Sequence, residues 1–404
     1  MQAQRYSYQE TLDFLYGREA HENPRPQDPK IFSAPCDVFF YPKFIDTLES
    51  YKSGNVTPEA FSEAIRQLEN HAAIPIGAHE FWLHPTLMTV LMNFFHETTK
   101  GLHDEPEYHW RRRIADAIVR TIDTRGGVAT IRSLPSERFD EVCTFAFRYC
   151  VSFPGLWRIL YELSYEPDAL LSYEKTIISV TASFISKLLE DADPNATDKT
   201  LTNEQLEALQ YVAPTVYNVA TATAESFGYL TSTASNGFLE QLKRLYDFLI
   251  EASDRGFRVP PRSVEALNNL IDRAIIFDSV AAINFSTGTL TRNLLVLLND
   301  FHPDVARSAA LAFGRICSTN AAVNNVWEAI KHPASLEAMQ QGFLKALRHS
   351  SVEFREGVAS ALLSMLDGPL RVQKHVFHDI LFDEEVQRRN KDLQDYSLLV
   401  ALYD

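Results

Sequence analysis

Two stretches of the chain, 49 residues apart, carry the same pattern of side chains, and this pattern constrains the fold more than any other feature. LLNDFHPDVARSAALAFGRIC at 297–317 aligns with ALRHSSVEFREGVASALLSML at 346–366. The aligned pairs are Leu298/Leu347, Asp304/Glu353, Val305/Phe354, Ala310/Ala359, Ala312/Ala361, Phe313/Leu362 and Ile316/Met365. Small residues let neighbouring helices approach, and large apolar ones fill the space between them. The alignment predicts a repeated unit of paired helices.

Helical spacing of apolar residues dominates the rest of the chain, and strand alternation is almost absent. Thr57-Pro58 places a cap residue and an N1 proline before one expected helix. Thr202 and Gln205 form the pattern of a capping box before another. Further helices are expected at about 84–99, 106–123, 136–150, 154–164 and 168–190. The fold class is therefore all-α.

Breaks in this pattern suggest how the chain is divided. We expect N-terminal helices and a proline-rich tether over 1–56, a helical domain of degenerate repeats over 57–190, an acidic linker at 191–201, and a repeat domain over 202–404. The expected architecture is an irregular α-solenoid, because short joints follow helix after helix. Separate multi-helix bundle domains are the alternative.

AALAFGRIC (309–317) resembles the third helix of an armadillo repeat, and the helix-pair pattern resembles armadillo and HEAT proteins generally. In that family an asparagine near the end of this helix lines a concave groove and binds the backbone of an extended peptide. The matching positions here are Asn218, Asn269, Arg315 and Ser364, spaced by about 48 residues. The resemblance implies that these four residues line a partner-binding groove. Arg and Ser at the last two positions depart from the family pattern.

Composition limits the partners. The 404 residues carry a formal net charge of -15, which disfavours attraction to nucleic acid or to an anionic membrane and favours a basic partner. The first residues lack the pattern of a secretory signal, and no run of about 18 apolar residues occurs. We expect a cytoplasmic or nuclear protein. The four cysteines do not form a disulfide framework.

Motifs for chemistry are weak. The chain has no Walker A, dinucleotide-binding or nucleophile-elbow motif, and no cofactor is expected. The acidic loop at 191–202 lacks the glycine and the final glutamate of an EF-hand. His79-Glu80 begins like a zinc-protease motif, but Leu83 stands where the second histidine belongs. His103, Asp104, Glu105 and His109 could hold a metal, although surface histidines are the simpler interpretation.

One dense basic run, Arg111, Arg112 and Arg113, could anchor an acidic segment or a phosphate, or could be a solvated helix face. The sequence as a whole predicts a non-catalytic scaffold or adaptor that presents a concave helical-repeat surface to an extended peptide or a helix of a protein partner. Two alternatives remain open: a regulator of a small GTPase or other signalling protein, and an enzyme or metal-binding helical protein.

Overall fold

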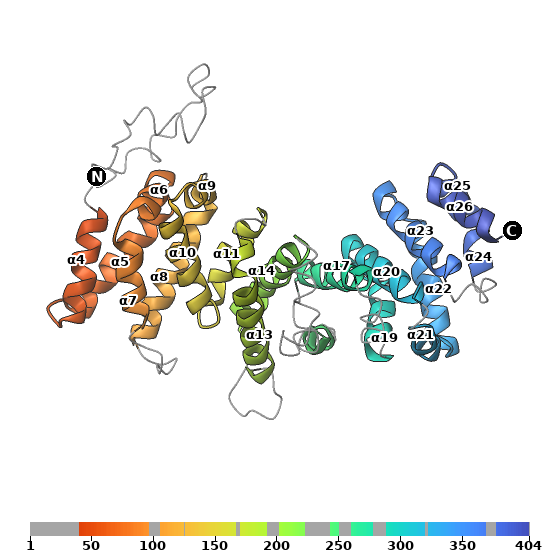
Figure 1. The fold of residues 1–404 in the computed structure, drawn as a ribbon, viewed down its shortest axis with the longest axis horizontal. Helices are drawn as coiled ribbons and strands as arrows, with labels where there is room; N and C mark the ends of the chain where they lie inside the picture. Colours follow the sequence, from red (N-terminus) through yellow and green to blue (C-terminus); the bar gives the residue numbers. More distant parts are fainter. Residues whose placement is uncertain are drawn as a thin grey trace, which may run out of the picture. The chain divides into compact units, whose positions relative to one another are not determined.

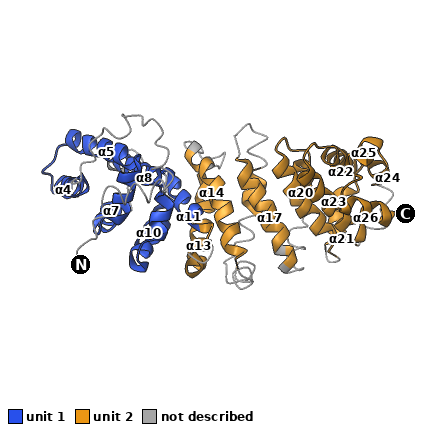
Figure 2. Ribbon diagram, turned by 90° about the horizontal axis from the view of Figure 1, so that it is seen from above, with its two compact units in different colours: residues 1–163 blue, residues 164–404 orange. Residues whose placement is uncertain are grey.

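The computed structural model describes residues 40–96, 106–124, 126–166, 170–191, 202–222, 243–249, 260–277, 288–319, 322–368 and 377–403. Every regular element in these ranges is a helix, so the all-α class is confirmed for them (Figure 1). The chain forms two compact units, residues 1–163 and 164–404 (Figure 2). The expected proline-rich tether and the acidic linker after Asp191 lie outside the described residues. No helix among the described residues is long and apolar enough to cross a membrane.

The α-helices of unit 1 range from 6 to 18 residues in length. They are α4 (Phe40–Lys52), α5 (Pro58–Ala72), α6 (Pro75–Leu83), α7 (Leu87–His96), α8 (Pro106–Asp123), α9 (Gly127–Arg132), α10 (Ser136–Tyr149), the 3-10 turn η1 (Pro154–Leu156) and α11 (Trp157–Ser164). The Thr57 side chain caps α5 by accepting a hydrogen bond from the Ala60 amide at 3.3 Å, as predicted. The sequence analysis expected helices somewhere over 1–56 but gave no range for α4, and it did not predict α6 or α9, whose nine and six residues are too few for a clear periodic signal.

Aromatic side chains fill the core of unit 1. Phe61 is fully buried and stacks on Tyr51, with ring centroids 4.1 Å apart. Phe95 packs edge-on against Phe145 and Phe153 at centroid distances of 5.1 and 5.3 Å. Such pairs contribute beyond the apolar area that they bury. Ring packing is therefore a major part of the core of unit 1.

The α-helices of unit 2 range from 4 to 18 residues in length. They are α13 (Glu174–Asp191) after the 3-10 turn η2 (Leu171–Tyr173), α14 (Asn203–Ala220), a helical segment at 243–249, α17 (Pro261–Phe277), α19 (Gly288–Leu297), α20 (Pro303–Cys317), α21 (Val323–Ile330), α22 (Pro333–Leu347), α23 (Val352–Asp367), α24 (His378–Leu381), α25 (Glu384–Asn390) and α26 (Gln394–Tyr403). The predicted capping box is present, since Thr202 and Gln205 exchange both hydrogen bonds at the start of α14.

A series of contacts runs through unit 2. Helix α14 packs against α17, α17 against α20, α20 against α23, and α23 against α26. Figure 2 shows α14, α17 and α20 following one another across the unit. Helices α19, α21 and α22 contact one another beside this series, and they join it where α19 and α21 touch α20 and where α22 touches α23.

The two stretches aligned at 49 residues occupy equivalent environments. All six aligned apolar pairs are buried, each residue being at most 6% exposed. Helices α20 and α23 approach closely where Gly314 faces Ala361, and a Cβ at Gly314 would lie 2.7 Å from the Ala361 carbonyl oxygen. The small residues in the pattern therefore have the packing role that the sequence assigns to them.

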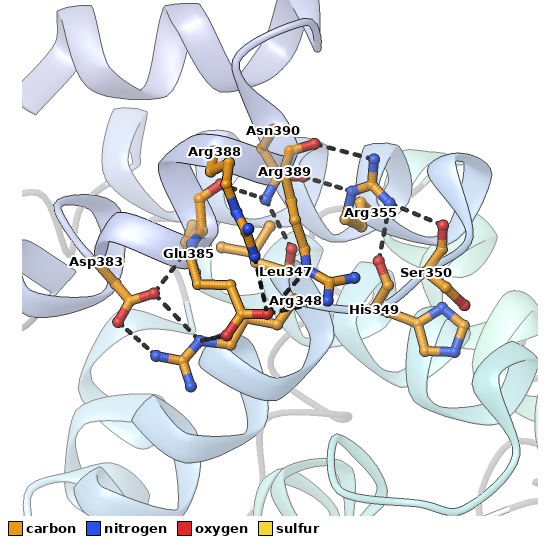
Figure 3. Close-up of polar contacts among 11 residues, drawn as sticks. Leu347, Arg348, His349, Ser350, Arg355, Asp383, Glu385, Arg388, Arg389 and Asn390 are labelled. Carbon is orange, nitrogen blue, oxygen red and sulfur yellow. Dashed lines mark hydrogen bonds and ion pairs between the residues drawn. The ribbon is translucent and has the colours of Figure 1, made fainter.

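The C-terminal end of unit 2 is joined by a polar network (Figure 3). Arg355 of α23 is 8% exposed and donates through Nε to the side-chain oxygen of Asn390 at 2.8 Å. Its other nitrogens donate to the backbone carbonyls of His349, Ser350 and Arg389 at 2.8 to 3.0 Å. The Asn390 amide donates to the carbonyl of Leu347 at 2.7 Å. One buried cation thus satisfies carbonyls at the ends of α22 and α25, where the helix dipole favours positive charge.

Candidate functional site

A cavity of about 430 Å³ opens between the C-terminal part of α14 and the exposed faces of α17 and α20. We call it the charged groove. Its lining residues are Tyr217 from α14, Glu265, Asn269, Asp272, Arg273 and Ile276 from α17, and Asp304, Arg307, Ser308, Leu311 and Arg315 from α20. All of them belong to unit 2. The α17–α20 contact that supports this groove is among the most extensive between the described helices of the unit.

Helical periodicity explains why these residues share one surface. The main α17 positions are 265, 269, 272 and 276, and the main α20 positions are 304, 308, 311 and 315. Both sets follow the same step of four, three and four residues, which keeps side chains on one face of a helix. The two helices run in the same direction, since Glu265 interacts with Asp304 near their starts and Asp272 bonds Arg315 near their ends.

The groove is rich in charge but poor in ion pairs. It contains three carboxylates and three guanidinium groups. One pair forms, from Arg315 Nε to Asp272 at 3.0 Å, with the two side chains 39% and 19% exposed. Glu265, Asp304, Arg273 and Arg307 take part in no hydrogen bond or ion pair with any described residue. The same holds for the amide of Asn269. Most polar groups of the groove are therefore available to a ligand.

Glu265 lies at the acidic end of the groove. Burial raises the pKa of its carboxyl group, and the negative charge of Asp304 raises it further, against the opposing effect of Arg262 and Arg307. The direction of this pKa shift means that the nearby arginines do not fully compensate the carboxylate. An incoming cation would supply that compensation.

A series of buried hydrogen bonds lies beside the groove and reaches it at Ser308. Asn268, which has no exposed surface, accepts from the Tyr246 hydroxyl at 2.8 Å and donates to Ser308 Oγ at 3.0 Å. Ser308 in turn donates to the carbonyl of Val305 at 3.0 Å. Complete burial raises the pKa of Tyr246 well above its ordinary value, so the phenol stays protonated and donates. These hydrogen bonds fix α17 against α20 and against the segment 243–249.

The structure places the four armadillo-like positions in two groups. Asn269 and Arg315 line the charged groove together. Asn218 is half-buried and donates to Ser164 Oγ at 3.0 Å, while Ser364 donates to the carbonyl of Ser360 at 3.0 Å. Neither of the last two lines the groove. The remaining lining residues were missed, although one helical step of three or four residues from Asn269 or Arg315 identifies Glu265, Asp272 and Leu311, and two steps from Arg315 identify Ser308.

The basic run of α8 does not form one exposed patch. Arg111 is 3% exposed and donates to the Phe94 carbonyl at 3.0 Å, so its assignment to a surface patch was wrong. Its position on α8 turns the side chain inward against the Phe94 ring, 5.0 Å away. Arg113 binds Glu69 through two nitrogens, each at 2.8 Å, and lowers the pKa of that carboxyl group. Only Arg112 of the three is classed as exposed.

The described part of the chain contains no cluster of three or more His, Cys, Asp or Glu side chains that could hold a metal ion. His79, which begins the partial zinc-protease motif, lies with its Nδ1 3.0 Å from the Thr130 hydroxyl oxygen. The His103-Asp104-Glu105 sequence and most of the 191–202 loop lie outside the described residues. Cys143, Cys150 and Cys317 are buried free thiols, and burial raises the pKa of each.

Comparison with known proteins adds no assignment. The sequence matches no family model, and it matches no curated protein sequence. Among solved structures, one match is the crystal structure of an engineered protein from the Northeast Structural Genomics Consortium, with 16% sequence identity over 90% of this chain and 98% of that chain, and a TM-score of 0.28. A TM-score this low establishes no common fold.

Proposed function

We propose that the chain is a non-catalytic scaffold or adaptor in which the charged groove binds an extended segment of a protein partner. The observation that carries the proposal is the set of unpartnered polar side chains on matching faces of α17 and α20. A polar group that serves only the fold is normally paired, because an unpaired one adds no stabilising interaction. The amide of Asn269 offers both a donor and an acceptor, which suits the unpaired backbone of an extended chain.

We further propose that unit 2 is an irregular α-solenoid of the armadillo or HEAT type. Three observations support this architecture: the order of contacts from α14 to α26, the 49-residue alignment, and the matching burial of its aligned positions. In such a solenoid, a continuous surface formed by successive helices is the usual binding surface. A multi-helix bundle remains the alternative architecture, and binding at the groove does not depend on the choice.

A photo-crosslinking experiment tests the binding proposal. A benzophenone amino acid replaces Leu311 on the groove in one full-length variant, and Val296, which is 59% exposed on α19, in a second variant. Each is irradiated in a lysate. We expect discrete protein adducts from position 311 that are missing from position 296. Adding Asn269→Ala and Arg315→Ala to the first variant should remove them. Identical adducts from both positions, or adducts that survive these substitutions, would contradict the proposal.

A further inference from the structure

The charged groove has two ends of opposite character. Glu265 and Asp304 lie near the starts of α17 and α20, and neither carboxylate has a partner among the described residues. Arg273 and Arg315 lie toward the ends of the same helices. Arg273 is exposed and unpartnered, and the hydrogen bond of Arg315 to Asp272 uses Nε, so its two terminal nitrogens form no hydrogen bond with described residues. The far end therefore retains donors for a carboxylate.

Arg307 does not cancel the acidic end. Its side chain extends toward α23, and a Cβ at Gly357 would lie 2.6 Å from its Nε. It forms no ion pair with Glu265 or Asp304, and its charge and that of Arg262 leave the pKa of Glu265 raised. Glu265 and Asp304 therefore both remain without an ion-pair partner among the described residues.

We infer that the groove selects a segment of mixed charge, with a Lys or Arg at the Glu265–Asp304 end and an Asp or Glu at the Arg273–Arg315 end. This inference rests on the proposed function, and it names the chemistry of the bound segment. The overall negative charge of the protein favours approach of the basic residue of the segment. The two arginines at the far end bind the acidic residue and so set the direction in which the segment runs along the groove.

The helix geometry sets the spacing between the two charged residues. Glu265 and Arg273 are eight positions apart and Asp304 and Arg315 eleven, which corresponds to about 12 to 16 Å along an α-helix. An extended chain covers about 3.3 Å per residue, so that span equals roughly four or five residues. The bound segment therefore carries its basic and acidic residues four or five positions apart.

Peptide display on the full-length protein tests the inference. Random 12-residue peptides are selected on the wild-type chain, and enriched peptides should contain a Lys or Arg four or five residues from an Asp or Glu. One such peptide is then used for double-mutant cycles. Glu265→Gln and Arg273→Gln should each weaken its binding roughly tenfold. Glu356→Gln on α23 and Arg244→Gln in 243–249 are matched exposed controls that should leave it unchanged.

The cycles assign each contact. Neutralising the basic residue of the peptide should be non-additive with Glu265→Gln and additive with Arg273→Gln, and the acidic residue should show the reverse. Circular dichroism of each variant confirms that it is folded. Enriched peptides of one charge sign, or additive cycles throughout, would overturn the inference while leaving groove binding in place. Failure to enrich any peptide, or affinities unaffected by combined Glu265→Gln, Asn269→Ala and Arg273→Gln, would overturn the proposed function as well.

Discussion

The charged groove and the C-terminal network of unit 2 contain the same kinds of residue and use them differently. At the C-terminal end, Arg348 pairs with Asp383, Arg389 pairs with Glu385, and Arg355 bonds Asn390 and three carbonyls (Figure 3). In the groove, one arginine of the three is paired. The two sets of polar side chains thus differ in whether they already have partners among the described residues.

This difference separates stabilising polar groups from binding groups. A buried cation such as Arg355 lowers the energy of the fold only while all its partners remain in place. An exposed and unpartnered group such as Arg273 contributes little to the fold and can be matched by another molecule. The comparison predicts that substitutions in the C-terminal network alter stability, whereas those in the groove alter binding.

The largest effect is expected for Arg355→Met. The substitution removes the hydrogen bonds to Asn390 and to the carbonyls of His349, Ser350 and Arg389, and it leaves those acceptors buried. The free energy of unfolding of unit 2 should fall by about 3 kcal/mol. Urea titration measures the loss, and hydrogen exchange should locate it in α22, α23 and α25.

Arg388→Met is the matched control. The Arg388 side chain is 73% exposed, and its one ion pair with a described residue is to Glu385 at 3.8 Å, so its removal should change stability by less than about 0.5 kcal/mol. Equal losses in the two variants would show that the buried network has no special role, and the comparison with the groove would fail.

A smaller effect is expected for Gly314→Ala, at the α20–α23 contact that separates the two regions. The added Cβ would lie 2.7 Å from the carbonyl oxygen of Ala361 and 3.0 Å from its Cα, and backbone cannot move aside as a side chain can. Overpacking costs about 1–3 kcal/mol, against a gain of about 1 kcal/mol in helix propensity. A net loss of about 1 kcal/mol in thermal or urea unfolding is expected. At Gly155, where the nearest atom is 3.8 Å away, the same change should cause no comparable loss.

The close approach at Gly314 shows how far sequence reasoning extends. The aligned alanines predicted that α20 and α23 pack closely, and the burial of Ala310, Ala359, Ala312 and Ala361 bears this out. Caps at Thr57 and Thr202 were predictable because they depend on residues three positions apart. Local and periodic signals such as these are what a single sequence carries.

The partners of polar side chains were not predictable. Nothing in the local pattern indicates that Arg355 meets Asn390, 35 residues later, or that Arg113 meets Glu69, 44 residues earlier. The residue next to a predicted groove position illustrates the same limit: Asn269 lines the groove, whereas Asn268 is completely buried between Tyr246 and Ser308. A shift of one residue along a helix rotates the side chain by about 100° around the helix axis. A sequence pattern that leaves the orientation of the helix uncertain by one residue therefore cannot tell a groove-lining side chain from a buried one.

The stability contributions of Asp383 in the C-terminal network and of Glu265 in the charged groove should depend on pH in opposite directions. Hydrogen bonding to Arg348 lowers the pKa of Asp383 below its ordinary value of 3.8, so its contribution to stability is present above that pH and lost as the pH falls through the lowered pKa. Burial raises the pKa of Glu265 above 4.5, so its carboxyl favours the folded state at low pH, and that contribution is lost as the pH rises through the raised pKa. The two regions should therefore respond to acid in opposite directions.

Charge-neutralising variants measure these two responses. At pH 7, Asp383→Asn should lower the free energy of unfolding by less than about 1 kcal/mol, as for a surface ion pair, because Asn still accepts the cap hydrogen bond from Val386. Glu265→Gln should raise it slightly at pH 7. The Glu265→Gln difference should shrink as the pH falls from the raised pKa toward 4.5, whereas the Asp383→Asn difference should shrink only as the pH falls below 3.8 toward the lowered pKa. Urea titrations between pH 3 and 7 give the curves, and differences of the same sign would contradict the assignment.

The smallest stability effect is expected for Arg273→Gln, and it is the most direct test of whether the groove is kept for binding. Arg273 is exposed and has no partner among the described residues, so its charge should contribute less than about 0.5 kcal/mol to unfolding. The same substitution should reduce binding of a display-selected peptide roughly tenfold. Measured side by side by urea titration and peptide binding, these outcomes would separate binding from folding at one residue. A stability loss of 1 kcal/mol or more would instead place Arg273 among the structural charges, as in the C-terminal network, and remove the distinction between the two regions.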